Sequence, residues 1–180
     1  MELYRGKPSE VEGREARELR VYEWLDRLGI TYERADHEPA KTMEACKQVD
    51  EALDVVMCKN LFLCNRQKTN FYLLMMPGDK PFKTKELSSQ IQSARLSFAS
   101  AEDMEKYLDF LPGAVSVMGL MNDCERKVQL LVDEDVLKEE YLGCHPCVNT
   151  SRLKLKTEDV FTTFLESVQH KAMTVVLKGE

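Results

Sequence analysis

A lysine inside an apolar run is the first residue of this chain whose position suits chemistry. Lys59 alternates with Val55 and Met57, which turns it to the same side as apolar neighbours. Lysines are rarely buried without a partner or a task, and an inward ammonium could hold a carbonyl, a phosphate or a carboxylate. The other interpretation is an edge-strand lysine that faces water. Asn60, the next residue, is expected to point the opposite way.

A histidine in a rigid turn is the second residue whose position suits chemistry. His145 lies between Gly143 and Pro146, so a constrained backbone presents its ring. Histidine titrates near neutral pH and could act as acid, base or hydrogen-bond donor. Without a nearby nucleophile in the sequence, a structural role is equally compatible with this position. His37 and His170 have weaker claims, because a turn and a helix end are ordinary surface positions.

Two cysteines flank this histidine. The spacing Cys144-x-x-Cys147 suits a redox dithiol or half of a zinc site. Zinc needs four ligands, however, and the other four cysteines form no second close pair. We therefore interpret both thiols as small apolar fillers and predict neither a metal nor a cofactor.

A loop of small residues is a third candidate element. It reads Gly113-Ala114-Val115-Ser116-Val117-Met118-Gly119 and lacks the Lys-Ser/Thr ending of a phosphate-binding P-loop. Its small side chains would let backbone N–H groups approach a ligand, and Ser116 adds a hydroxyl. A serine nucleophile would need a base partner, which spacing alone does not reveal.

Composition limits the possible partners. The 180 residues are 43% hydrophobic and 31% charged, which is typical of one globular domain, and no apolar run approaches the roughly 20 residues that span a bilayer. No secretory leader is recognisable, so we expect a cytoplasmic protein with six free thiols. The net charge of −6 argues against binding along duplex DNA. A local grip on nucleic acid is conceivable at Lys80, Lys83, Lys85 and Arg95, although a solvated helical face explains them equally well.

Elements of uneven length must position these residues. Periodicity predicts helices over 14–28, from Thr42 to about Leu53, from Ser100 and from Thr157, and strands over 30–34, 55–64, 70–76, 128–132 and 173–177. A further strand pair over 141–155 is interrupted by the turn that carries the histidine. This order does not match a regular βαβ repeat, so we predict a mixed α/β fold, with a sheet curled into a barrel-like core. We expect one domain over 1–180, with 1–13 as a flexible extension.

Combined in this order, the motifs resemble the YbaK/ProX/PrdX group of prolyl-tRNA editing proteins, the aminoacyl-tRNA deacylases. The resemblance runs from about Arg17 to Leu177 and rests on the segments 21–30, 58–62, 113–123 and 143–150, the last with the pattern Gly-x-His-Pro. It implies a mixed, largely antiparallel sheet closed around a small pocket, with helices outside.

The resemblance also implies an activity and roles for residues. Members hydrolyse the ester that joins a wrong amino acid to the 3′ end of proline tRNA. Lys59 would contact the terminal adenosine or its phosphate, and Asn60 would help to orient the substrate. Gly143 and His145 would position the ester carbonyl and water. The residues that would line the amino-acid pocket are Gly113, Ser116 and Gly119.

The 116–119 segment is most similar to the alanine-clearing, PrdX-like branch, although many relatives carry proline where Val117 stands. Alanine is therefore the expected amino acid, with cysteine and serine next, and proline would be excluded by its size. The resemblance implies a metal-free reaction in which the ribose hydroxyl of the substrate activates water. Its partners would be the acceptor end of proline tRNA and prolyl-tRNA synthetase. Two alternatives stay open: a non-catalytic module that senses tRNA or proline, and a thiol-redox or zinc protein.

Overall fold

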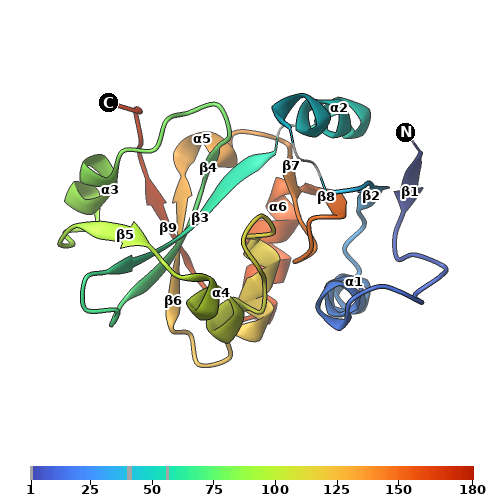
Figure 1. Ribbon diagram of the computed structural model, residues 1–180, viewed down its shortest axis with the longest axis horizontal. Coiled ribbons are helices and arrows are strands. Elements are labelled where there is room, and N and C mark those ends of the chain that lie inside the picture. The colour runs from blue at the N-terminus through green and yellow to red at the C-terminus, as the bar shows by residue number, and fades with distance from the viewer. Residues whose placement is uncertain (1, 40–41, 56) are drawn as a thin grey trace.

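The computed structural model describes residues 2–39, 42–55 and 57–180, which form two β-sheets with helices around them (Figure 1). The first sheet has the order β1-β2-β8-β7 and is antiparallel throughout. Its strands are Leu3–Arg5 (β1), Glu33–Asp36 (β2), Ser151–Lys156 (β8) and Tyr141–Cys144 (β7). The first sheet therefore brings the end of β2 beside the start of β8 and the histidine turn that connects β7 and β8.

The second sheet has the order β5-β3-β4-β6-β9. Its strands are Leu96–Phe98 (β5), Cys58–Asn65 (β3), Phe71–Pro77 (β4), Val128–Asp133 (β6) and Ala172–Val175 (β9). β3 pairs antiparallel with β4 and β5, whereas β4–β6 and β6–β9 are parallel. The prediction of a mixed α/β fold is confirmed.

The prediction of a barrel is wrong. A closed barrel requires the first and last strands of a sheet to pair. Here β1 and β7 end the order of one sheet, and β5 and β9 end that of the other. An isolated parallel bridge between Met57 and Gly143 links the two sheets where β3 begins and β7 passes. Two open sheets joined at a corner thus replace the predicted barrel.

Helices cover the faces of both sheets. They are Ala16–Leu28 (α1), Met43–Leu53 (α2), Thr84–Gln90 (α3), Ala101–Leu108 (α4), Glu134–Leu137 (α5), Thr157–Asp159 (α6) and Leu165–Ser167 (α7). A 3-10 turn spans Val117–Asn122 (η1), and a π-helical stretch, Val160–Phe164 (η2), joins α6 to α7. The first sheet lies between α1 and α2, which cover its opposite faces (Figure 1).

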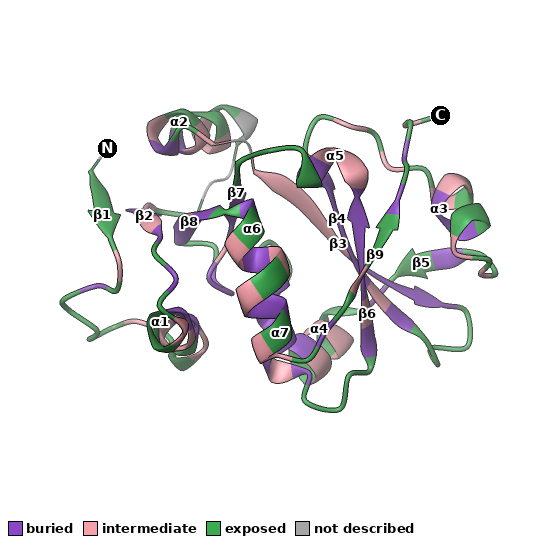
Figure 2. Cartoon of the chain, turned by 180° about the vertical axis from the view of Figure 1, so that it is seen from behind, coloured by how far each residue is buried: buried purple, intermediate pink, exposed green. Residues whose placement is uncertain are grey.

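Strand alternation divides the core in two. On β3, Phe62 and Cys64 join the main cluster, which also contains α1, η1 and the inner face of the first sheet. Leu63 belongs instead to a second cluster under α3. In Figure 2 the inner strands β4 and β6 are largely buried, as expected for strands covered on both faces, whereas much of the edge strands β5 and β9 is exposed. Successive residues of β3 therefore face different environments, which matters for Lys59 and Asn60.

Several predicted ends of helices are confirmed by capping residues, whereas one predicted strand begins later than expected. Thr42 caps α2 by accepting a hydrogen bond from the Ala45 N–H at 3.1 Å, and Ser100 caps α4 in the same way. The strand expected over 30–34 begins at Glu33, because Gly29 ends α1 in a left-handed conformation and the chain needs residues 30–32 to return to the sheet.

Part of the expected N-terminal extension is ordered, since residues 3–5 form β1 and pair with β2. The strand expected from Val55 begins at Cys58, and Val56 lies outside the described residues. No described helix combines the length and apolar character that crossing a bilayer would require.

Candidate functional site

The glycine-flanked loop and the histidine turn meet in space, although about thirty residues separate them in sequence. The fully buried Ser116 hydroxyl donates to the backbone carbonyl of His145 at 2.5 Å and accepts from the Met118 N–H at 3.1 Å. Gly113 approaches the Asn149 side chain from the other end of the loop. Ser116 therefore joins η1 to the turn, and its hydroxyl is engaged on both sides.

Loss of this hydroxyl should loosen the junction. In Ser116→Ala the His145 carbonyl and the Met118 N–H both lose a buried partner, so we expect the free energy of unfolding to fall by about 1–3 kcal/mol. Urea denaturation measures this change, and Ser89→Ala, at an exposed position on α3, is the control. An unchanged unfolding free energy in Ser116→Ala would contradict the structural role of the hydroxyl.

The ring of His145 is held in one tautomer. Its Nδ1 lies 3.2 Å from the Ser151 carbonyl oxygen, and because a carbonyl can only accept, Nδ1 carries the proton and Nε2 keeps its lone pair. Burial lowers the pKa of His145 to about 4, and the charges of Arg152 and His37 act in the same direction. The imidazole is therefore neutral at pH 7 and can accept a proton or a hydrogen bond at Nε2.

A buried ionic network fixes the strand that holds this ring. The Ser151 hydroxyl donates to Asp36 at 2.6 Å, and Arg14 and Arg34 both pair with the same carboxylate. Burial alone would raise the pKa of Asp36, but hydrogen bonds from the two guanidinium groups and from Ser151 lower it to about 2. Because β8 begins at Ser151, this network positions the acceptor of the His145 N–H.

Lys59 and Asn60 lie on opposite faces of β3, as predicted. The Lys59 ammonium donates to the Lys80 carbonyl at 2.7 Å, which leaves two of its three donors for other partners. Asn60 shares the face of Phe62 and donates to the Cys58 carbonyl at 3.2 Å. Its Oδ1 is buried and accepts no hydrogen bond within the described part of the chain, so it is available to a donor of a ligand.

The bridge between the sheets brings the backbones of Lys59 and His145 to one region, because each follows a bridged residue, Met57 or Gly143, by two positions. Their side chains nevertheless take different partners, the Lys80 carbonyl and the Ser151 carbonyl. The structure thus groups the two residues by backbone placement and not by a direct contact.

Close packing explains why two positions, 119 and 143, are glycine. A Cβ on Gly119 would lie 2.9 Å from both the Leu108 carbonyl and the Phe110 ring, and a Cβ on Gly143 would lie 2.6 Å from the Met57 sulfur. Gly119 therefore serves the contact between η1 and the end of α4. Gly143 allows β3 and β7 to approach, which places it beside the candidate site. A role in substrate binding stays a prediction for Gly113, Ser116 and Gly119.

A small cavity lies between the loop and the turn. Its volume is about 90 Å³, and it is lined by residues of both segments and by the start of α1. Its lining consists of Glu15, Arg17, Leu111, Pro112, Ala114, Cys147, Val148 and Asn149. The Arg17 Nη1 is buried and donates no hydrogen bond within the described residues, and the guanidinium lies within 4 Å of the Glu15 and Asp109 carboxylates.

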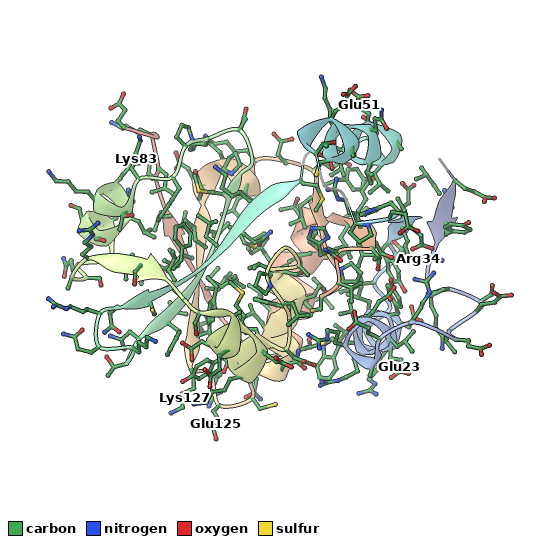
Figure 3. All side chains as sticks on the ribbon, in the orientation of Figure 1. Glu23, Arg34, Glu51, Lys83, Glu125 and Lys127 are labelled. Atoms are coloured by element: carbon green, nitrogen blue, oxygen red, sulfur yellow. The ribbon has the colours of Figure 1, made fainter. Side chains whose placement is uncertain are left out.

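The lysines predicted to grip nucleic acid are not one cluster. The Lys80 ammonium contacts Asp133 at 2.6 Å, Asp135 at 2.9 Å and the Leu177 carbonyl at 2.7 Å. These contacts use all three of its donors, so Lys80 does not fit a phosphate-binding role. The other three residues are exposed: Lys83 caps α3, Lys85 lies on it and Arg95 follows it. In Figure 1, α3 lies at the end of the molecule far from α1 and α2, and Figure 3 labels Lys83 there.

The cysteines beside the histidine are buried fillers. All six cysteines are unpaired, and Cys144 and Cys147 are buried. Burial raises the pKa of both thiols, that of Cys147 to about 12, so neither is a thiolate at neutral pH. Within residues 2–39, 42–55 and 57–180, no three His, Cys, Asp or Glu side chains are grouped as a metal site would require. The apolar interpretation of the two cysteines therefore fits the structure better than the redox one.

Comparison with known proteins gives this arrangement a family. The family model described as an aminoacyl-tRNA editing domain matches residues 37–163, which include the loop, the turn, Lys59 and Asn60. The chain belongs to the aminoacyl-tRNA editing domain family. A prolyl-tRNA editing protein, ProX, from Acetoanaerobium sticklandii is 34% identical over 137 residues, which cover 76% of this chain and 83% of that protein.

Two further similarities agree with membership of the editing-domain family. A prolyl-tRNA synthetase associated domain-containing protein from Danio rerio is 29% identical, over 82% of this chain and 80% of its own length. The solved structure of a candidate trans-editing enzyme for prolyl-tRNA synthetase superposes with a TM-score of 0.67 at 14% identity, over 91% of this chain and 99% of that one. The structural match shows that the fold is shared.

Sequence reasoning missed residues of this editing domain that surround His145. His37 donates from its backbone to the Thr150 carbonyl at 2.9 Å, and its buried Nε2 makes no hydrogen bond among the described residues. Arg152 ties the turn to α2 by contacting Asp50 and the Cys46 carbonyl. In the sequence His37 had only the signal of a histidine before Glu-Pro, which is common on surfaces, whereas Arg152 had none.

Proposed function

We propose that this chain is a trans-editing deacylase that hydrolyses the ester between a wrongly attached amino acid and the 3′ end of proline tRNA. Its similarity to a prolyl-tRNA editing protein over most of both chains supports this substrate. The observation that carries the chemistry is His145, a neutral imidazole whose Nδ1 donates to a carbonyl and whose Nε2 has no hydrogen-bond partner among the described residues. Such a ring can accept a hydrogen bond from water or from the ribose hydroxyl.

The proposed reaction uses the substrate, one water and residues of this chain. A water oxygen bonds to the ester carbonyl carbon, the carbon–oxygen bond to the ribose breaks, and a proton passes to the departing ribose oxygen. In this proposal His145 and Gly143 position the carbonyl and the water, and Asn60 accepts from the substrate on the Phe62 face of β3. Lys59, on the opposite face near the start of β3, would use its remaining donors to hold the terminal adenosine or its phosphate. The free ribose hydroxyl of the substrate activates the water.

Alanine is the amino acid that we propose for removal. The 116–119 segment, which is similar to that of the alanine-clearing branch, supports this choice, and the small cavity between the loop and the turn, about 90 Å³, would form part of the pocket. Its walls include buried side chains such as Ala114 and Cys147, which would resist enlargement. Size exclusion would then protect correctly charged prolyl-tRNA.

A non-catalytic module that binds tRNA or proline is the second candidate function. It would use the same loop and turn, because a retained pocket does not by itself produce turnover. In either function the partners that we propose are the acceptor end of proline tRNA and prolyl-tRNA synthetase.

A panel of esters tests the proposed substrate. Proline tRNA charged with alanine, cysteine, serine or proline is incubated with the protein, and loss of each aminoacyl ester is followed over time. We expect the alanyl ester to disappear fastest and the prolyl ester to persist. Preferential loss of the prolyl ester would contradict size exclusion, and faster loss of the cysteinyl or seryl ester would replace alanine as the substrate.

A further inference from the structure

Beyond the part that α2 covers, one face of the first sheet carries three cations, the carboxylate of Glu33 and one aromatic ring. In antiparallel pairs, directly opposite residues share a face. Lys156 lies opposite Tyr141, and Lys154 lies opposite Gly143. Across the next two strands, Glu33 lies opposite Lys154 and Arg5 lies opposite Glu33. The register therefore places Arg5, Lys154, Lys156 and Tyr141 on one side of the sheet.

These residues border an open cavity of about 540 Å³ at the surface. Two carboxylates, Asp26 and Glu33, also line it. No ion pair within 4.0 Å that the described residues form includes Arg5, Lys154 or Lys156, in contrast to the fully engaged Lys80. The three cations thus remain available to an anionic partner.

Tyr141 adds an aromatic surface. Its side chain is 37% exposed, and the Lys154 ammonium lies 4.7 Å from the ring centroid. Unpaired RNA bases stack on exposed aromatic rings, and neighbouring cations hold the phosphates. Tyr141 precedes His145 by four residues along β7 and the turn, about 14 Å at the rise of an extended chain.

Charge changes sign at this ring. On its other side Tyr141 lines a second cavity, which has one cation, Lys47, and five carboxylates, of which Asp50 pairs with Arg152; the other four are Glu51, Asp54, Glu139 and Glu140. This excess of negative charge would repel a phosphate backbone, since like charges oppose each other across short distances. A polyanion is therefore confined to the side of Arg5, Lys154 and Lys156.

We propose that Arg5, Lys154, Lys156 and Tyr141 form the surface that binds the single-stranded 3′ end of the tRNA, with a base on Tyr141 and backbone phosphates on the three cations. This inference rests on the proposed function and replaces the distant set Lys83, Lys85 and Arg95 as the RNA grip. Arg5 lies before residue 37, where the match to the family model begins, so part of this surface lies outside the matched region.

Two variants with the same charge change test the proposal. One combines Arg5→Gln, Lys154→Gln and Lys156→Gln, and the other combines Lys83→Gln, Lys85→Gln and Arg95→Gln; each moves the net charge from −6 to −9 by removing three cations. Both are assayed on alanyl-tRNA(Pro) and on 3′-alanyl-adenosine, an ester without upstream phosphates. Binding of uncharged tRNA(Pro) is titrated with salt.

We expect the first variant to raise KM for the charged tRNA about tenfold. The slope of log binding constant against log salt concentration should become less steep by about 2, since each of three single-strand phosphate contacts contributes roughly 0.7. The rate of this variant on alanyl-adenosine should match that of the unmodified protein. The second variant should leave both substrates and the slope unchanged. An equal or larger effect of the second variant, or none of the first, would overturn the proposed surface.

Tyr141 is tested by a matched pair. Tyr141→Ala should weaken tRNA binding about tenfold through lost stacking, whereas Tyr141→Phe keeps the ring and should bind normally. Equal binding by both variants would remove Tyr141 from the surface. If the unmodified protein hydrolyses neither ester, the proposed function fails, and the salt titration still decides the binding surface.

Discussion

Replacement of His145 by alanine is expected to lower the rate of alanyl-tRNA(Pro) deacylation by about 100-fold or more, the usual contribution of a positioned acid–base group. The reason is the loss of the free Nε2, which Ser151 keeps unprotonated by accepting the Nδ1 hydrogen. Rates under saturating substrate measure the effect, with circular dichroism to check folding.

His145→Asn separates chemistry from packing, because an asparagine amide can donate to the Ser151 carbonyl but supplies no imidazole nitrogen. We expect it to fold well and to remain as slow as the alanine variant. In the unmodified protein the pKa of His145 is lowered to about 4, so kcat/KM should stay level down to about pH 5 and fall as the ring becomes protonated. Activity of the asparagine variant near that of the unmodified protein would exclude Nε2 from the reaction.

Lys59 donates a hydrogen bond to the Lys80 carbonyl, yet we expect substitution of the first lysine to lower activity and substitution of the second to lower stability. Lys59→Met should lower deacylation by about 100-fold, as the loss of one positioned donor does, and change the free energy of unfolding by about 1 kcal/mol. Lys80→Met should instead cost about 3–5 kcal/mol of stability, because it leaves the buried carboxylate of Asp133 without its counter-ion.

Urea denaturation and deacylation assays on both variants measure this contrast. Methionine keeps an unbranched side chain of similar length, so packing is largely preserved in each case. A loss of stability in Lys59→Met as large as that in Lys80→Met would show that Lys59 has a structural task. A deacylation rate of Lys59→Met equal to that of the unmodified protein would remove Lys59 from the site.

Local chemistry made some features of this molecule predictable. Thr42 and Ser100 cap helices through their own hydroxyls, and the opposite facing of Lys59 and Asn60 follows from strand geometry. Such features depend on neighbours within a few residues, which a sequence displays directly. The histidine turn was found for the same reason, since glycine and proline mark it.

Features that depend on tertiary placement were not predictable. Alternation of apolar and polar residues does not show whether strands close into a barrel, because closure depends on whether the two edge strands of a sheet pair with each other. In the second sheet the edge strands β5 and β9 do not pair. Lys80 resembled a surface cation, yet Asp133 and Asp135 come from a segment more than fifty residues away. His37 and Arg152 reached the site only through the pairing of β2 with β8.

The proposed deacylase is best tested by counting the alanyl-tRNA(Pro) molecules deacylated by each protein molecule, with a metal chelator present throughout. We expect many turnovers at an undiminished rate with the chelator, and loss of these turnovers in His145→Ala. Tight binding of the tRNA without ester loss would contradict this expectation and favour the non-catalytic module. Activity that disappears with the chelator would contradict the metal-free reaction.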